Sequence, residues 1–229
     1  ASDLVALDFT WEGTVSAAWD EAGNWSGGQV PTAVDNAIIP TDPASDPDVF
    51  PVISTSAQCN ALEVQANAQL TISPTGGLTT NGTLNFETGS EIKVEASAAS
   101  KGNLLTPGGI GTHNGTATVE VVLEKNEFHY IASPVEGANN NEFLTSGTNS
   151  DFYTYNESYP GTNTNLAWDP YTTPGSTLVP GTGYARNQPY VDKTYTLSGT
   201  NFNNGTVSVD VYNSGTAPAH GWRSDERRV

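Results

Sequence analysis

Residues 62–72 read LEVQANAQLTI and residues 84–94 read LNFETGSEIKV. Apolar residues recur between the two stretches at an offset of 22 positions, where Leu62, Val64, Leu70 and Ile72 correspond to Leu84, Phe86, Ile92 and Val94. Inside each stretch they alternate with polar residues, as half-buried strands require. A fixed offset near 20 residues with turn signals between the copies is typical of a parallel β-helix. We therefore expect Leu62 to stack on Leu84 and Leu70 on Ile92 in parallel register, with a meander of evenly spaced strands as the alternative.

The composition agrees with an all-β protein. The 229 residues include 23 Gly and 14 Pro, which break helices and supply turns, while five Trp, nine Tyr and seven Phe need a core. The net charge of −17 repels nucleic acid and anionic lipid, so neither nucleic-acid binding nor membrane insertion is expected. Cys59 is the single cysteine, which excludes an internal disulfide and favours a small buried apolar residue over a reactive thiol.

The chain divides into three predicted regions. Residues 1–105 are expected to form a Trp-capped β-helical region, the small and Gly-rich residues 106–117 a linker, and residues 118–229 a second β region. Short strands such as 118–124 and 128–132, joined by long polar loops, are typical of a β-sandwich or jelly-roll. The predicted fold is all-β: a short right-handed parallel β-helix followed by an antiparallel β-sandwich or jelly-roll.

The N-terminal stretch carries two features with alternative interpretations. Trp11, Trp19 and Trp25 are either a sugar-stacking platform or a cap over the open end of the coils, and the cap is favoured because that end must be covered. Residues 1–9 read as a strand with no local hairpin partner. This strand either lies along the first coil or adds to a neighbouring molecule, which would give self-association and filaments.

Binding residues are expected in the second region rather than in the coils. Aromatic side chains in or beside long loops are the candidates for a ligand-binding surface, because loops tolerate exposed recognition residues. They are Tyr153, Tyr155, Tyr159, Trp168 and Tyr171. Surfaces or glycans are the expected partners.

A Ca²⁺ site in the Pro-rich loop is the one cofactor hypothesis. Asp42, Asp46 and Asp48 place hard oxygen donors on a stiff loop, but their spacing matches no EF-hand and a solvated acidic loop is the favoured interpretation. The three histidines show no metal-ligand spacing, and no G-x-S-x-G turn occurs. No catalytic residue is predicted, and the protein is expected not to be an enzyme.

Two stretches resemble a known family. The first runs from Trp11-Glu12-Gly13 through Gly23-Asn24-Trp25 and Val30-Pro31-Thr32 to Ala68-Gln69-Leu70-Thr71-Ile72. The second includes Phe128-His129-Tyr130-Ile131-Ala132-Ser133-Pro134-Val135, Asp151-Phe152-Tyr153-Thr154-Tyr155, Leu178-Val179-Pro180-Gly181-Thr182-Gly183-Tyr184 and Tyr195-Thr196-Leu197-Ser198-Gly199. Together they resemble the N-terminal β-helical module and following β-sandwich of large surface proteins that Bacteroidota export by type IX secretion.

The resemblance implies a secreted protein at the cell surface. It implies a structural or adhesive role in a large surface protein or fibre, with an accessory carbohydrate-binding module of a polysaccharide-degrading enzyme as the alternative. Chains of that family usually continue into a C-terminal sorting domain. Here the composition changes abruptly, since three of the four Arg lie in the last seven residues, which predicts a truncated or altered end.

Overall fold

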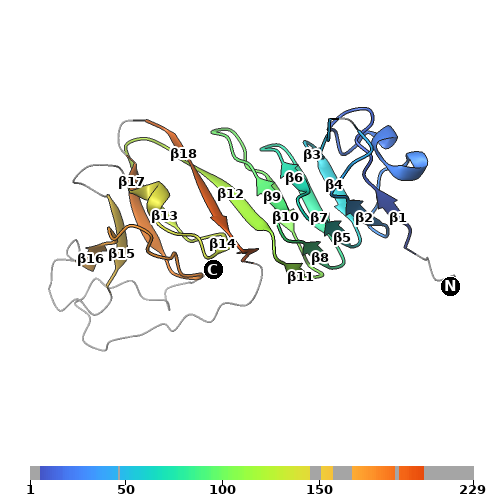
Figure 1. Cartoon of the computed structure of the whole chain (residues 1–229). Coiled ribbons are helices and arrows are strands. Elements are labelled where there is room, and N and C mark those ends of the chain that lie inside the picture. Colours follow the sequence, from blue (N-terminus) through green and yellow to red (C-terminus); the bar gives the residue numbers. More distant parts are fainter. Residues whose placement is uncertain (1–5, 46, 145–150, 157–166, 189–190, 204–229) are drawn as a thin grey trace, which may run out of the picture.

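The computed structural model describes residues 6–45, 47–144, 151–156, 167–188 and 191–203. These residues are almost entirely strands, turns and loops. Three 3₁₀ turns are the helical elements: η1 (Ala22–Asn24), η2 (Ser26–Gly28) and η3 (Asn141–Phe143). No helix in this part of the chain is long and apolar enough to cross a membrane. Figure 1 shows the strands from β1 to β12 stacked along one axis, with further strands continuing beyond β12.

Three sheets form the sides of the stack, and the chain visits them in a repeating order, so each coil gives one strand to each sheet. The first sheet contains β1 (Asp8–Thr10), β2 (Asn36–Ile39), β5 (Leu62–Val64), β8 (Leu84–Phe86) and β11 (Ile110–His113). The second contains β4 (Ser56–Cys59), β7 (Gly77–Thr80) and β10 (Asn103–Leu105). The third contains β3 (Val52–Ile53), β6 (Gln69–Ile72), β9 (Glu91–Val94), β12 (Thr116–Leu123) and β18 (Lys193–Gly199).

The register of the coils confirms the predicted stacking. Leu62 pairs with Leu84, and Leu70 pairs with Ile92, both in parallel strands. This pairing excludes the antiparallel meander. The stack also extends further than the repeat, because Ala37 pairs with Leu62 and Ile92 pairs with Ala117, each pair 25 positions apart. Extra residues in the corners lengthen these outer coils, so the fixed offset of 22 holds only for the central pair.

Alternation along each strand separates the core from the surface. Leu62, Leu70 and Ile92 are at most 1% exposed, whereas Glu63, between two inward residues of β5, remains half-buried. Because side chains of successive coils lie directly above one another, they form one continuous apolar column. Cys59 lies in the same core and is fully buried, as expected for a small apolar residue.

Residues 106–117 differ from the predicted linker. They contain β11, which pairs with β8, and the start of β12, which pairs with β9, so the segment belongs to the stack. Its glycines serve close packing: a Cβ at Gly108 would clash with the carbonyl oxygen of Gly82, and one at Gly111 with the side-chain oxygen of Asn85. Small residues here let one coil approach the preceding coil closely. A Gly-rich composition is also typical of flexible linkers, which is why a linker was predicted for this segment.

The tryptophan-rich segment covers the N-terminal end of the core, in agreement with the predicted cap. Trp11, Trp19 and Trp25 are at most 2% exposed and meet edge to face, with ring centroids 5.1 Å and 4.6 Å apart around Trp25. Two of the three indoles make hydrogen bonds: the Trp11 indole donates to the Val49 carbonyl at 2.7 Å and the Trp25 indole to the Trp19 carbonyl at 2.8 Å. The buried Trp19 indole nitrogen has no hydrogen-bond partner among the described residues. The buried rings leave no exposed stacking platform at this end.

Asn24 holds the cap segment together from inside. Its side-chain oxygen accepts hydrogen bonds from the Val15 and Ser16 amides at 2.9 Å, and its side-chain nitrogen donates to the Ala18 carbonyl at 2.9 Å. Asn24 is fully buried, so these bonds replace those it would make with water. Next to the cap, β1 pairs in parallel with β2, so Asp8 and Phe9 of the predicted N-terminal strand pair within the chain, while residues 1–5 lie outside the described residues.

Beyond the coils the pairing changes to antiparallel. Strand β12 pairs in parallel with β9 over residues 116–119 and antiparallel with β18 over residues 117–123, so one strand belongs to both arrangements. The remaining strands form a four-stranded and a two-stranded antiparallel sheet. The larger contains β13 (Glu127–Ile131), β17 (Tyr184–Gln188), β15 (Phe152–Tyr155) and β16 (Trp168–Pro170), and the smaller β14 (Val135–Glu136) and β19 (Asn201–Phe202).

Replacing Leu70 by Ala should lower the free energy of unfolding by about 2–5 kcal/mol, because it opens a cavity in the central column. The matched change Gln69→Ala, at an exposed outward position next to it, should stay within about 0.5 kcal/mol. Denaturant unfolding of both variants measures the difference. Equal effects of the two changes would contradict the inward placement of Leu70.

The Cys59 thiol should be inert in the folded protein. Burial raises its pKa to about 12, so the reactive thiolate is scarce at pH 8 and the sulfur is also inaccessible. We expect no reaction with an aromatic disulfide reagent under native conditions and one thiol per chain in denaturant. Rapid labelling of native protein would show that the core around Cys59 opens.

Candidate functional site

The register of the four-stranded sheet assigns side chains to its two faces. Tyr130 on β13 pairs with Ala185 on β17, and Ala185 pairs with Tyr153 on β15, so these three side chains share one face. Tyr155 follows Tyr153 by two positions and pairs with Trp168 on β16, which puts both on the same face. Phe128 precedes Tyr130 by two positions and joins them. We call Phe128, Tyr130, Tyr153, Tyr155 and Trp168 the aromatic face.

The opposite face of this sheet is part of the core. Phe152 and Tyr184 stack there at 5.4 Å, and Phe143 of η3 stacks on Phe152 at 4.7 Å. Tyr195 of β18 stacks on the other side of Phe143, also at 4.7 Å. All four are at most 2% exposed. This buried aromatic cluster fixes the sheet against β18, so the aromatic face points away from the core.

The aromatic face is the most exposed concentration of large apolar side chains in the described antiparallel strands. Tyr130 is 72% exposed and Phe128 62% exposed, while Tyr153, Tyr155 and Trp168 are half-buried. The Tyr130 and Trp168 rings lie 5.9 Å apart with planes inclined by 33°, and the Tyr155 and Trp168 rings 5.0 Å apart at 62°. Contacts between rings on three different strands make the aromatic face continuous.

A small residue on β17 lies between the aromatic residues of the neighbouring strands. Ala185 pairs with both Tyr130 and Tyr153 in the ladder and is 2% exposed. A larger side chain at this position would stand between the strands that carry the rings.

Polar groups accompany the rings at one end of the sheet. Asp151 precedes β15, and burial together with the charge of Asp151 and a hydrogen bond to it raises the pKa of the Tyr153 hydroxyl. The Asn187 amide donates to the Asp151 carbonyl at 2.9 Å, which ties the end of β17 to this point. The neutral Tyr153 hydroxyl donates to the Asp151 carboxylate beside the apolar rings, and the oxygens of both groups keep lone pairs that can accept hydrogen bonds.

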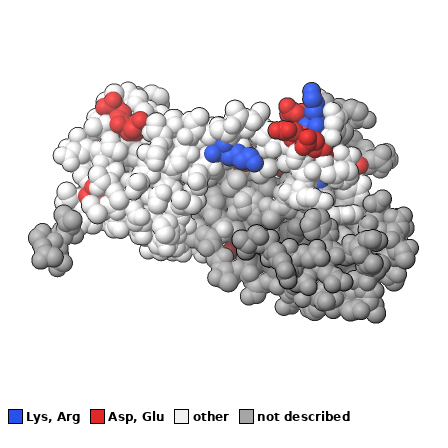
Figure 2. Space-filling model, turned by 180° about the vertical axis from the view of Figure 1, so that it is seen from behind, with Lys and Arg blue, Asp and Glu red and all other residues white. Residues whose placement is uncertain are grey.

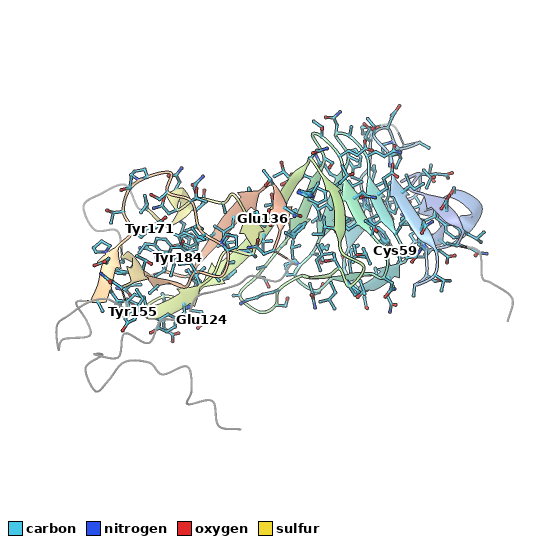
Figure 3. The ribbon with its side chains drawn as sticks, turned by 90° about the horizontal axis from the view of Figure 1, so that it is seen from below. Cys59, Glu124, Glu136, Tyr155, Tyr171 and Tyr184 are labelled. Carbon is cyan, nitrogen blue, oxygen red and sulfur yellow. The ribbon has the colours of Figure 1, made fainter. Side chains whose placement is uncertain are left out.

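The structure brings together three of the five aromatic residues expected to bind a ligand. Tyr153, Tyr155 and Trp168 lie on the aromatic face, and Tyr159 is outside the described residues. Tyr171 lies on the other face, 5.3 Å from the Tyr184 ring, where its hydroxyl donates to the Thr177 carbonyl at 2.9 Å. Figure 3 shows Tyr155 on the opposite side of the strands from Tyr171 and Tyr184.

Phe128 and Tyr130 were missing from the predicted binding residues. They lie in a strand, and the prediction searched loops. Their signal was the alternation Phe128-His129-Tyr130, in which His129 faces the other side and approaches the Glu124 carbonyl at 2.8 Å. In a strand, side chains two positions apart share a face, so Phe128 and Tyr130 lie together on one side of the sheet. Here that side is exposed to solvent.

The predicted Ca²⁺ ligands remain separate from this site. Asp42 and Asp48 are both exposed in the loop before β3, and Asp46 is outside the described residues. Within the part of the chain that the structure describes, no group of three acidic, His or Cys side chains is close enough to hold a metal ion.

Comparison with known proteins assigns the chain to a family by sequence. Residues 10–227 match a family described as a domain of unknown function, DUF8693. The match spans nearly the whole chain, so the protein belongs to this family. No curated protein and no solved structure matches the chain significantly.

The two faces of the four-stranded sheet should respond differently to truncation. Phe152→Ala should lower the free energy of unfolding by about 3–5 kcal/mol, because Phe152 lies in the centre of the buried cluster. Tyr130→Ala should change it by less than about 1 kcal/mol, because most of that ring is already in water. Thermal or denaturant unfolding distinguishes them. A large loss for Tyr130→Ala would place the aromatic face in the core.

Proposed function

We propose that this protein is a non-catalytic extracellular adhesive module of the cell surface, in which stacked coils form a stalk and the aromatic face contacts a surface or glycan. The observation that carries the proposal is the aromatic face itself. Exposed apolar rings gathered on one sheet face are unfavourable in water unless a partner covers them, and such patches usually mark interaction sites.

The scaffold suits that role. The aromatic rings sit on strands of a sheet whose other side is fixed by stacked buried aromatics, so their positions are set by the core. A rigid face loses little conformational entropy when a ligand binds. In this proposal the described antiparallel strands are part of a β-sandwich, which the packing of Tyr195 of β18 against Phe143 and the four-stranded sheet supports.

The sequence resemblance supplies the proposed setting. A chain that resembles the surface proteins exported by type IX secretion in Bacteroidota would be presented outside the cell as part of a large protein or fibre. The acidic composition, with a net charge of −17, favours solubility and suits a protein exposed to solvent.

An accessory carbohydrate-binding module is the second candidate. The same aromatic face favours it, because rings on a sheet can pack against the apolar faces of sugars. The two candidates differ in what surrounds the module, an adhesive surface protein or a polysaccharide-degrading enzyme, and they share the binding site.

Binding of the purified chain to a panel of insoluble polysaccharides and cell surfaces tests the proposal. Trp168→Ala and Tyr130→Ala should each remove most of the bound fraction, because each deletes a ring from the aromatic face. Leu105→Ala is the matched control, since Leu105 is an exposed apolar residue, 53% accessible, on β10 of the coils.

Equal binding by all three variants would overturn the proposal, as would the absence of binding to every surface in the panel. Circular dichroism and unfolding curves of each variant establish that the lost binding does not come from a lost fold.

A further inference from the structure

We propose that the aromatic face binds an internal segment of an extended, uncharged polysaccharide, with neighbouring sugar rings lying against Tyr130 and Trp168. This inference rests on the proposed function and names the class of ligand that the same site takes. Three features support it: the area of the aromatic platform formed by Tyr130, Trp168 and Phe128, the contact by which Tyr155 holds Trp168, and the charges around the aromatic face.

The platform is larger than one sugar ring. The Tyr130 and Trp168 centroids are 5.9 Å apart and their planes differ by 33°, so the two rings lie in contact on this face. Phe128 lies two positions from Tyr130 on the same strand and continues the surface along β13. A single sugar can cover only part of this area, whereas a chain of sugars can cover all of it. The buried area, and with it the affinity, therefore grows with chain length.

Tyr155 acts as a positioning residue for the platform. The Tyr155 and Trp168 ring centroids are 5.0 Å apart and the ring planes are inclined by 62°. This edge-to-face contact holds the indole in place and leaves its exposed surface uncovered. Among the described residues, Trp168 is the one aromatic residue of β15 and β16 whose ring contacts Tyr130. The orientation of the Trp168 ring therefore decides whether the platform is continuous. Removing Tyr155 should loosen Trp168 without deleting a ring that touches the ligand.

The charges disfavour an anionic polymer. Asp151 is close to Tyr153 at one end of the face, and Glu124 precedes the turn that leads into β13. Figure 2 shows the described part of one side of the molecule, where charged side chains are few and form no broad basic patch. With a net charge of −17, the protein repels polyanions at a distance.

The polar groups beside the rings suit sugar hydroxyls. The exposed Tyr130 side chain ends in a hydroxyl that can donate and accept, and the Asp151 carboxylate and the Tyr153 hydroxyl, which are hydrogen-bonded to each other, present acceptor oxygens. Such groups fix the orientation of a ligand that the rings hold by apolar contact. A hydroxyl-rich chain with flat apolar ring faces matches both features.

Affinity electrophoresis in gels containing soluble polymers tests the ligand class. An uncharged glucan, an anionic uronic-acid polymer and a cationic glucosamine polymer are compared at low and high salt. We expect retardation by the uncharged glucan that changes little with salt, and no retardation by the anionic polymer. Tyr130→Ala and Trp168→Ala should weaken retardation by about 10-fold, whereas Tyr130→Phe, which keeps the ring, should weaken it by less than about 3-fold.

A length series separates a chain segment from a single sugar. Competition by oligosaccharides of one to six units should strengthen at least 10-fold between the monosaccharide and the longest member. Tyr155→Phe should bind as the unchanged protein does, and Tyr155→Ala should weaken binding. Tyr155→Ala should also change the Trp168 emission, obtained as the difference from a Trp168→Phe background, which a residue without a positioning role would not do.

The outcomes distinguish the proposed binding function of the aromatic face from the proposed class of ligand. Retardation by the anionic or the cationic polymer that depends on Tyr130 and Trp168 would leave the proposed function standing and overturn the uncharged class. Equal competition by the monosaccharide and the longest oligosaccharide would overturn the extended segment. Binding that no aromatic variant changes would overturn both.

Discussion

A stack of coils buries one continuous column of side chains, and both ends of that column must be covered. Every other part of this molecule depends on that constraint. At the N-terminal end three buried tryptophans close the column, held by edge-to-face contacts, by the indole hydrogen bonds of Trp11 and Trp25 and by the fully buried Asn24. At the other end Phe202 of β19 packs against Phe86 of the last complete coil, with ring centroids 6.1 Å apart. The antiparallel strands therefore serve the coils as a cover, in addition to carrying the aromatic face.

The connection between the two parts is a shared strand. Residues 116–119 of β12 continue the parallel ladder of β9, and residues 117–123 begin the antiparallel ladder with β18. An ion pair reinforces the junction, since the Lys93 ammonium on β9 lies 2.9 Å from the Glu120 carboxylate on β12 and 3.1 Å from Glu95. Glu120 also accepts a hydrogen bond from the Ala96 amide at 3.1 Å. These bonds leave little freedom between the last coil and the first antiparallel strand.

The sequence allowed the central coils to be predicted, because strict alternation and equal corner lengths make Leu62 and Leu84 equivalent. The outer coils could not be predicted from a fixed offset, because their corners contain extra residues. The predicted linker was wrong because Gly108 and Gly111 pack closely against the preceding coil. For the site, aromatic residues near loops led to Trp168 and two tyrosines. Phe128 and Tyr130 required knowledge of which face of β13 is buried, and that depends on the distant residues Phe143 and Tyr195.

The double pairing of β12 also has a mechanical consequence. In the proposed function, a surface-bound ligand that pulls on the aromatic face would transmit its tension to the coils through β12 and its neighbours. Seven residue pairs join β12 to β18, and four join it to β9, in ladders that lie side by side along the same strand. A force directed along β12 shears these hydrogen bonds together instead of opening them one at a time. In the proposed adhesive role this junction would resist such a force, which a flexible linker at residues 106–117 would not do.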